Sequence, residues 1–189
     1  MTIEIAVRVL GEPDWQLYRD IRLRALRESP HEFTATFAEE SDRSEQFWRD
    51  QMSRSRRLLA ERDHQAEGIL SLASYDPEPA AVEIFGLYVV PQARGTGVSW
   101  RLVETASDLA RTLGFRQAYY WVGADNGRAI GFAKNLGFRS TGYRRPARTG
   151  ESDLDGEEEI ALVLSLDTDT TVVPNPTSGR PAPRSGPTS

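Results

Sequence analysis

Apolar and polar residues follow two different spacings along this chain. Alternation with a period of two, together with short apolar runs, is typical of strands, whereas apolar residues three or four positions apart are typical of helices. The strand pattern occurs near residues 3–9, 57–62, 67–75, 82–90, 118–122, 139–145 and 158–166. The helical spacing occurs near residues 14–28, 44–53, 96–113 and 127–136. Strands in series followed by a strand–helix–strand–helix half predict an α/β protein with a mixed sheet.

Two of the predicted helices end in the same way, in Leu113-Gly114-Phe115-Arg116 and Leu136-Gly137-Phe138-Arg139. Such a pair could be an internal repeat. We interpret it instead as two helix ends, because glycine accepts the left-handed turn that follows a helix and the next apolar residue packs back on it.

The segment 80–90 is apolar on both of its alternating faces. One face carries Val82, Ile84, Tyr88 and Val90, and the other carries Ala81, Phe85, Leu87 and Val89. A strand of this kind is typical of the centre of a sheet that is covered on both sides. We therefore predict that residues 82–90 form the central strand.

Composition narrows the class of protein. The chain has 189 residues, a net charge of −5 and no cysteine. The length suits one domain, the negative charge argues against a broad surface for nucleic acid, and the lack of cysteine excludes disulfides and thiolate ligands. No apolar run approaches the length of a membrane span, and the first ten residues do not resemble a signal peptide. We expect a cytoplasmic protein that binds neither nucleic acid nor membrane.

The last part of the chain differs from the rest. Residues 168–189 contain five of the eleven prolines, among threonine, serine and glycine. Such a segment cannot bury enough apolar surface to fold. We expect the folded domain to comprise residues 1–167 and residues 168–189 to form a disordered tail.

The most informative stretch is the turn between the predicted central strand and the helix near 96–113. Glycines let a backbone come close to a ligand, and the first N–H groups of a helix are free to bind a phosphate. A Walker loop would end in Gly-Lys-Ser/Thr, and a dinucleotide fingerprint would need a third glycine where the chain has Trp100, so neither matches. The pattern Gln/Arg-x-x-Gly-x-Gly/Ala does match, at Gln92, Gly95 and Gly97. A glycine-bearing helix start without a ligand is the alternative.

A second motif lies downstream of this turn. The segment 126–138 begins with Asn126, has Ala129 three residues later, ends in Leu-Gly-Phe and follows a strand rich in aromatic residues. The two segments, in this order, resemble motifs A and B of the GNAT superfamily of acetyl-CoA-dependent N-acyltransferases. The resemblance is strong over about residues 80–140 and looser elsewhere. It implies a central mixed sheet of six to seven strands flanked by about four helices.

The resemblance also implies acetyl-CoA as the cosubstrate and no metal. The residues whose backbone amides or hydroxyl would hold the pyrophosphate are Arg94, Gly95, Thr96, Gly97, Val98 and Ser99. The pantetheine arm would pair with the backbone of Leu87, Tyr88 and Val89. Asn126 would reach the same arm, cap its helix, or do both, and the Arg94 side chain would contact phosphate or be solvated.

Two groups are expected to act in the reaction. A backbone N–H near Tyr88 or Val89 would polarise the thioester carbonyl. Glu83 lies in the central strand, where some family members place a catalytic carboxylate, and it could take the proton of the attacking amine as a general base. The alternative for Glu83 is a hydrogen-bonded or solvated carboxylate at a strand end.

The sequence departs from the family pattern at Ala133. Many members carry a tyrosine there, which is thought to protonate the leaving thiolate, and alanine cannot do so. A coenzyme A thiol has a pKa of about 8.5, close to that of cysteine, so the thiolate can leave with modest help. Water, Ser99, Tyr120 and Tyr143 are the candidates for that help.

The acceptor side is open to two interpretations. The region between the first two strands contains Phe33, Phe37, Phe47 and Trp48 together with Glu32, Glu39, Glu40, Asp42 and Glu45. It could form an apolar slot with an acidic rim for a cationic amine, but we favour a packed helix pair with a solvated acidic face. In the same way, the basic residues Arg144, Arg145 and Arg148 and the acidic run 157–159 fit a solvated hairpin more simply than a substrate-contacting loop.

We therefore expect an N-acetyltransferase that moves an acetyl group from acetyl-CoA to a primary amine by direct attack in a ternary complex. The acceptor would be a small molecule or a peptide, and many relatives of this kind are homodimers. Ala133 leaves an alternative open, a degenerate acyl-CoA-binding module that senses or regulates without turnover. A third hypothesis, an interaction protein without a ligand, rests only on the tail.

Overall fold

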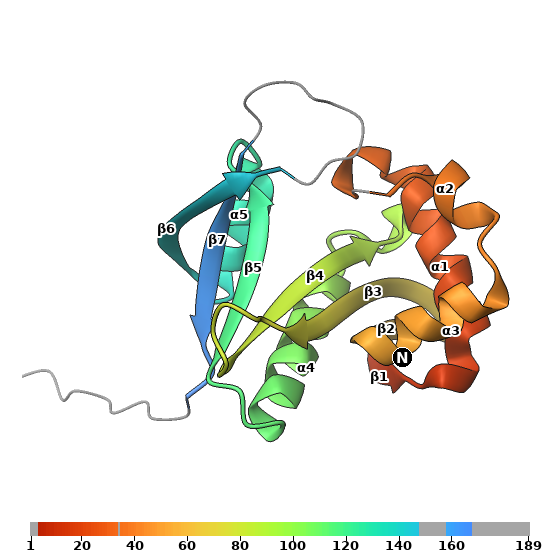
Figure 1. The fold of residues 1–189 in the computed structure, drawn as a ribbon, viewed down its shortest axis with the longest axis horizontal. Coiled ribbons are helices and arrows are strands. Elements are labelled where there is room, and N and C mark those ends of the chain that lie inside the picture. Colours follow the sequence, from red (N-terminus) through yellow and green to blue (C-terminus); the bar gives the residue numbers. More distant parts are fainter. Residues whose placement is uncertain (1–3, 34, 148–157, 168–189) are drawn as a thin grey trace, which may run out of the picture.

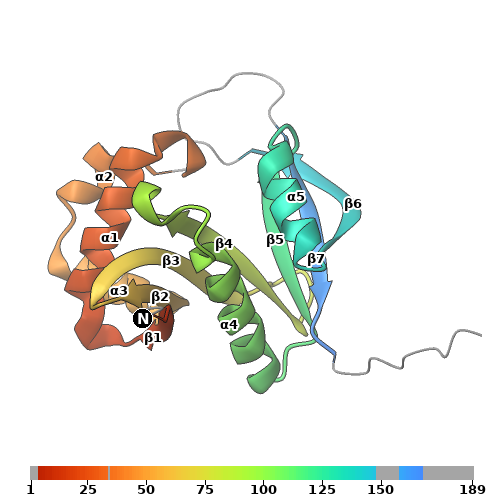
Figure 2. The ribbon, with the colours of Figure 1, turned by 180° about the vertical axis from the view of Figure 1, so that it is seen from behind.

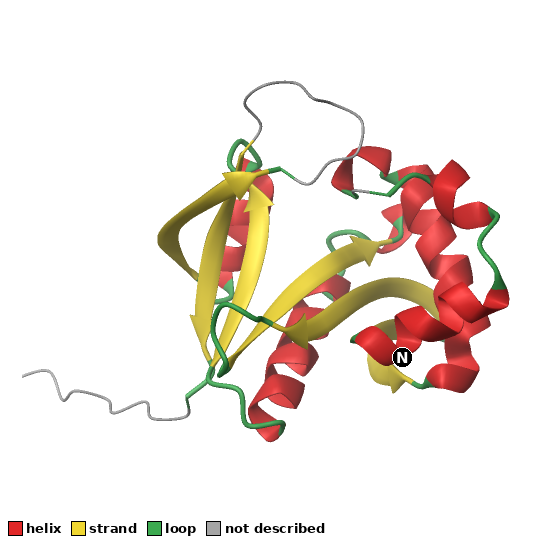
Figure 3. Cartoon of the chain, viewed as in Figure 1, coloured by secondary structure: helices red, strands yellow, loops and turns green. Residues whose placement is uncertain are grey.

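A computed structural model gives the fold of residues 4–33, 35–147 and 158–167, and the structural statements below concern these residues (Figures 1 and 3). In chain order the elements are β1 (Ala6–Leu10), η1 (Glu12–Asp14), α1 (Trp15–Glu28), η2 (Pro30–Glu32), α2 (Phe37–Ser41), α3 (Glu45–Arg54), β2 (Arg56–Arg62), β3 (Gln65–Ser74), β4 (Ala81–Val89), η3 (Pro91–Ala93), α4 (Val98–Thr112), β5 (Gln117–Gly123), α5 (Gly127–Asn135), β6 (Arg139–Pro146) and β7 (Glu158–Ser165). Every predicted strand and helix is present. The tail predicted for residues 168–189 lies outside the described residues.

The strands form one seven-stranded sheet in the order β1-β2-β3-β4-β5-β7-β6. β4 lies at its centre, as the two apolar faces of this segment predict. β4 and β5 run parallel and are connected through α4, whereas the other neighbouring strands are antiparallel. The mixed sheet confirms the predicted fold class, and the described residues form five α-helices where about four were expected.

Helices cover both faces of one half of the sheet. α1 and α3 lie on one side of β2 and β3, and α4 lies on the opposite side (Figures 1 and 2). α5 covers β5 and β7 on the same side as α4 (Figure 2). Apolar side chains between these layers form the main core, and they include Trp48, Leu58, Leu70, Leu102 and Leu162. None of the helices built by the described residues is long and apolar enough to cross a membrane.

The short helix α2 is an element that apolar spacing does not predict. It begins at Thr36, whose hydroxyl accepts a hydrogen bond from the N–H of Glu39 at 3.2 Å. In return, the carboxylate of Glu39 accepts from the N–H of Thr36 at 2.8 Å. This reciprocal pair satisfies two of the donors that a helix start leaves free. Two polar residues, and not an apolar stripe, therefore define where α2 begins.

β4 bends in its second half. In the pairing with β3, Ser71 lies opposite Phe85 but Ile69 lies opposite Tyr88, so β4 has one extra residue in this stretch. Gly86 lies within it and has a left-handed backbone, with a φ of +62°. Glycine adopts this conformation without steric cost, so the bulge falls where the chain has one.

The bulge corrects one prediction about side-chain direction. Strict alternation places Tyr88 on the same face as Val82 and Ile84. The extra residue turns Tyr88 to the face that carries α1, where its hydroxyl hydrogen-bonds to Glu28. The predicted face of Tyr88 is therefore wrong, because a bulge shifts the alternation of every residue that follows it.

α4 packs directly on a glycine of β3. A Cβ built on Gly68 would lie 2.9 Å from Val98 Cγ1 and 3.1 Å from Leu102 Cδ1, and both of these residues belong to α4. We expect Gly68→Ala to push α4 away from the sheet and to lower the free energy of unfolding by about 1–3 kcal/mol, because a packed core does not absorb an added methyl group. Urea unfolding of the variant and the wild type measures this difference.

Gly131→Ala is the matched control for that substitution. Gly131 lies inside α5, and a Cβ built there would meet nothing within 4 Å. Alanine is favoured over glycine in a helix by roughly 0.5–1 kcal/mol, so this variant should be more stable than the wild type. A Gly68→Ala protein that unfolds at the wild-type urea concentration would contradict the close contact between α4 and β3.

Candidate active site

β4 and β5 separate after four paired residues. Their parallel ladder runs from Ala81 opposite Gln117 to Ile84 opposite Tyr120. Beyond this point the rest of β5 is paired with β7, and β4 diverges from β5 (Figure 1). Within the described part of the chain, the edge of β4 that faces β5 therefore has no strand beside it after Ile84.

Strand alternation identifies the backbone groups on this free edge. Val90 donates its N–H toward β3, to the carbonyl of Glu67 at 2.9 Å. Tyr88, two residues earlier, faces β3 in the same way, whereas Leu87 and Val89 direct their N–H and C=O groups away from β3. Of the three residues predicted to pair with a pantetheine arm, Leu87 and Val89 are placed to do so, and the backbone of Tyr88 is not.

The turn after β4 presents amides that have no partner in the part of the chain that the structure describes. Gly95 and Gly97 are left-handed, with φ values of +78° and +93°, and α4 begins immediately afterwards at Val98. The N–H groups of Arg94 and Thr96 close the turn, but for those of Gly95, Gly97 and Val98 the described structure contains no acceptor. The positive end of the α4 dipole lies at the same place. Three of the five predicted amides are thus free for an anion.

The side chain of Arg94 turns back onto the protein. Its Nε donates to the carbonyl of Val89 at 3.1 Å, and its Nη2 donates to Ser29 Oγ at 3.2 Å. Arg94 therefore braces the turn against the end of α1, a role that the sequence does not predict. Because Arg94 hydrogen-bonds to the carbonyl of Val89, the N–H of Val89 is the backbone group of this residue that stays free on the edge of β4.

A second set of contacts ties α1 to the same turn. The Tyr88 hydroxyl donates to the carboxylate of Glu28, which also pairs with Arg24 Nε at 3.0 Å. Arg24 Nη2 continues to Gln92 Oε1 at 3.3 Å. The hydrogen bond from Tyr88, helped by Arg24, holds the pKa of Glu28 below its usual range, while burial raises the pKa of Tyr88. These contacts fix the end of α1 to the strand and to the turn that follows it.

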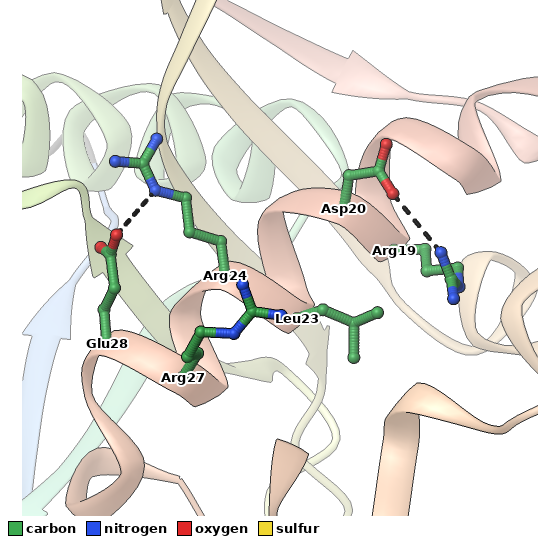
Figure 4. Close-up of a pocket in the computed structure, with 6 residues that line it drawn as sticks. All are labelled: Arg19, Asp20, Leu23, Arg24, Arg27 and Glu28. Carbon is green, nitrogen blue, oxygen red and sulfur yellow. Dashed lines mark hydrogen bonds and ion pairs between the residues drawn. The ribbon is translucent and has the colours of Figure 1, made fainter. Parts of the chain in front are cut away.

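Two hollows in the surface lie away from these groups. One, of about 490 Å³, runs along α1, and Figure 4 shows its lining residues: Arg19, Asp20, Leu23, Arg24, Arg27 and Glu28. Four of its charges are paired, Arg19 with Asp20 and Arg24 with Glu28. The other, of about 500 Å³, lies between the end of α3 and the end of α4. Neither contains a predicted site residue, so the candidate site is an open strand edge and turn.

Glu83 has a charged partner. Arg145 of β6 places Nη2 at 3.4 Å from Glu83 Oε1 and Nε at 2.6 Å from Glu159 Oε2. Its guanidinium also lies 4.1 Å from the centre of the Trp121 ring. The side chain of Glu83 is 18% exposed, so this carboxylate is largely buried and ion-paired. Its role as a base stays a prediction.

The predicted basic hairpin is only half solvated. Arg144 pairs with Glu158 at 2.6 Å and is exposed, as a solvated hairpin predicts. Arg145 instead turns toward the sheet and reaches Glu83, 62 positions away. Two other members of the predicted hairpin, Arg148 and Glu157, lie outside the described residues.

Tyr120 lies at the point where β4 and β5 separate, on the face of the sheet opposite the side chain of Glu83. It pairs in register with Ile84, and its ring packs edge-on against Phe138, with 6.2 Å between ring centres. Ala133, in α5, is buried on this side of the sheet with 1% exposure. Tyr143, another candidate proton donor, is 56% exposed on β6.

Asn126 caps α5. Its Oδ1 accepts a hydrogen bond from the N–H of Ala129 at 3.0 Å, which satisfies one of the free donors at the helix start. The capping role that the sequence suggests is therefore confirmed. The contact of Asn126 with a pantetheine arm stays a prediction.

The acidic residues between β1 and β2 are largely engaged. Glu40 accepts two hydrogen bonds from Arg22, both at 3.0 Å, Glu39 caps α2, and Glu45 pairs with Arg49 at 2.7 Å. Arginines also lie over three of the aromatic rings of this region. These contacts agree with the packed helix pair that we favour from the sequence.

Comparison with known proteins identifies the class. Residues 21–138, more than half of the chain, match the model of the Acetyltransferase (GNAT) family. The chain belongs to this family, and the predicted resemblance is confirmed. An uncharacterized N-acetyltransferase of Methanocaldococcus jannaschii is 41% identical over 56 residues, which are 30% of this chain and 25% of that relative. The chain thus spans a quarter of the length of this relative.

Solved structures of other acetyltransferases share the fold. A GNAT-family acetyltransferase of Streptococcus pneumoniae superimposes with a TM-score of 0.69 at 16% identity, covering 86% of this chain and 99% of the other. The ribosomal-protein-alanine N-acetyltransferase of Brucella melitensis gives 0.66 at 19% identity, with 85% and 99% covered. A Salmonella typhimurium protein described as an acetyltransferase, solved with its cofactor acetyl-CoA, gives 0.64 at 20% identity, with 88% and 96% covered.

Proposed function

We propose that this protein transfers the acetyl group of acetyl-CoA to a primary amine. One observation carries the proposal: the free edge of β4 leads directly into the turn of unpaired amides at the start of α4. A free strand edge suits an extended arm, and the turn suits an anion. From Val89 back to Ile84 the edge spans five residues, roughly 16 Å at the usual rise of a strand, which suits an extended pantetheine arm.

The chain's own groups would hold the cosubstrate along this path. The unpaired amides of the turn, together with the Ser99 hydroxyl, bind the pyrophosphate, and Leu87 and Val89 pair with the arm. Acetyl-CoA supplies the activated acetyl group. With the arm extended back to Ile84, the predicted N–H of Val89 pairs with the arm, and a backbone N–H further along the free edge donates to the thioester carbonyl and stabilises the negative charge that develops there during attack. This donor belongs to the backbone of a central strand, so it is held in place before the substrate arrives.

Glu83 is the proposed general base. An amine must lose a proton to attack, and a carboxylate near the acceptor can take it. Glu83 lies on the face of the sheet opposite Tyr120, away from α4 and α5. The cosubstrate would enter from the α4 side and the acceptor from the other, so that both are bound together and attack is direct. The acceptor is a small-molecule or peptide amine.

A second function, acyl-CoA binding without turnover, is favoured by one observation. Ala133 is a buried methyl group at the position where the family motif carries a tyrosine. A protein of this kind would bind acetyl-CoA at the same edge and turn. It would differ from an enzyme only in releasing no coenzyme A.

The test is release of free coenzyme A thiol from acetyl-CoA, measured across a panel of polyamines, amino acids, peptides and aminoglycosides. We expect release that depends on one class of amine. Calorimetry with acetyl-CoA in the same preparation separates the alternatives. Binding without thiol release would support the sensor, and absence of binding at millimolar acetyl-CoA would overturn both functions.

A further inference from the structure

We propose that the hydroxyl of Tyr120 donates a hydrogen bond to the sulfur of coenzyme A as it leaves. This inference rests on the proposed acetyl transfer and names the residue that assists the departure of the thiolate. Three features of the structure carry it: the position of Tyr120 where β4 and β5 separate, the face on which its ring lies, and a hydroxyl that has no partner among the described residues.

The position of Tyr120 is set by the ladder between β4 and β5. Tyr120 and Ile84 form its last rung, so the ring of Tyr120 stands at the closed end of the gap between the two strands. An arm that starts at the turn and follows the free edge of β4 reaches this end with its thioester. The reacting bond would therefore lie within reach of residues on this rung.

The face of Tyr120 separates it from the base. Its ring packs against Phe138, three residues after the end of α5, whereas Glu83 contacts Arg145 and shares a rung with Tyr119 on the other face. A cosubstrate held at the start of α4 approaches from the face of Tyr120. The leaving sulfur then lies on the side of Tyr120, and the attacking nitrogen on the side of Glu83.

The hydroxyl of Tyr120 is available, unlike those of its neighbours. Tyr88 donates to Glu28 and Tyr119 donates to Glu78, the latter at 2.8 Å. For Tyr120 the described residues provide no hydrogen-bond partner. Burial of the ring, and then the negative charge of Glu32, raise the pKa of Tyr120 to about 12, so the phenol keeps its proton at neutral pH.

Other candidate donors are placed less well. Ser99 lies in the first turn of α4, beside the amides that would hold the pyrophosphate, and Tyr143 is exposed on β6, on the far side of β7 from the gap. Ala133 has no proton to give. Tyr120 is thus the described phenol that combines a free hydroxyl with a place at the closed end of the gap.

The chemistry balances without transfer of the phenolic proton. The amine nitrogen forms a bond to the acetyl carbon, the carbon–sulfur bond breaks, and its electron pair goes to sulfur. The amine proton passes to Glu83 and then to solvent, and the free thiolate takes a proton from water after release. A hydrogen bond from a neutral phenol to a developing thiolate is charge-assisted, and it strengthens as the bond breaks.

The experiment compares Tyr120→Phe with Tyr119→Phe and the wild type. Both variants remove one hydroxyl from adjacent residues of β5, but on opposite faces of the sheet. With acetyl-CoA and an amine found to react, we expect Tyr120→Phe to lower kcat by about 10- to 100-fold, the usual cost of one hydrogen bond to a charged group. Tyr119→Phe should leave kcat near the wild-type value, and the calorimetric Kd for acetyl-CoA should be unchanged in both.

A second acetyl donor distinguishes assistance to the leaving group from a structural role. In acetyl-selenocoenzyme A the leaving atom is selenium, which departs as a far more stable anion and needs no donor. The loss caused by Tyr120→Phe should shrink markedly with this substrate. Incorporation of 3,5-difluorotyrosine at position 120 provides a variant that keeps the ring, and its more acidic phenol should raise kcat with the thioester only.

The outcomes separate the inference from the proposed function. A wild-type protein that releases no thiol from acetyl-CoA would overturn acetyl transfer, and this inference with it. Turnover that Tyr120→Phe leaves unchanged would overturn the inference alone. An equal loss of kcat with the thioester and the selenoester would also overturn the inference alone, because a loss caused by a structural disturbance does not depend on the leaving atom.

Discussion

Glu83→Gln should lower kcat by about 10²- to 10⁴-fold, the range over which a positioned general base accelerates a reaction. The amide has the size of the carboxylate and can still accept a hydrogen bond from Arg145, but it cannot take a proton from the amine. The affinity for acetyl-CoA should stay unchanged, because the unpaired amides and the free strand edge contain no part of Glu83. Thiol release with a reactive amine and calorimetry with acetyl-CoA measure the two effects separately.

Glu159→Gln is the control that this ion-pair network offers. Arg145 lies between Glu83 and Glu159, at 3.4 Å and 2.6 Å from the two carboxylates. If Glu83 mattered only as a partner of Arg145, loss of charge at Glu159 would disturb the site as much. We expect Glu159→Gln to keep most of the wild-type kcat. Equal losses in the two variants, or no loss in Glu83→Gln, would remove Glu83 from the chemistry without touching the proposed activity.

Gly97→Val should weaken the binding of acetyl-CoA by roughly tenfold or more. Gly97 has a φ of +93°, and a side chain in this left-handed region costs about 1–2 kcal/mol, more when it is β-branched. The turn can relieve the strain by rotating out of this conformation, which takes the amides of Gly97 and Val98 away from the position of the pyrophosphate. To bind acetyl-CoA, the turn would then have to return to the strained conformation. Each 1.4 kcal/mol that this return costs raises Kd by a factor of ten.

The other end of α4 supplies a matched control for this variant. Gly114 has a φ of +86°, and a Cβ built on it would meet nothing within 4 Å. Gly114→Val therefore introduces the same kind of backbone strain just after the other end of α4, far from the turn at residues 94–98. Both variants should lose similar stability in urea, but only Gly97→Val should lose affinity in calorimetry. Similar Kd values for the two would show that the turn does not hold the pyrophosphate.

Much of the fold follows from local patterns in the sequence. Glycine at 114 and 137 marks two helix ends because the left-handed turn after a helix needs it, and the doubly apolar segment 82–90 is the centre of the sheet. The turn at residues 94–98 is predictable for the same reason: Gly95 and Gly97 have positive φ values that other residues rarely adopt. These features depend on neighbours in the chain, which a sequence displays directly.

The features that the sequence does not predict depend on distant partners or on a shift in register. The bulge at Gly86 reverses the direction of Tyr88, and because the segment 80–90 is apolar on both faces, its sequence does not reveal the shift. Arg145 reaches Glu83 across 62 positions, and Arg94 turns toward Ser29 across 65. An arginine can be solvated, bind phosphate or brace a turn, and only the packed structure decides among these roles.

The free edge of β4 has a thermodynamic consequence. If an extended arm pairs with Leu87 and Val89 as proposed, this edge gains backbone hydrogen bonds that only the folded sheet can offer, so ligand binding stabilises the folded state. By mass action, a ligand present at 100 times its Kd adds about 2.7 kcal/mol to the free energy of unfolding. The lifetime of this chain against unfolding and proteolysis would then follow the concentration of acyl-CoA around it, and starvation for the cosubstrate would remove the protein as well as its activity.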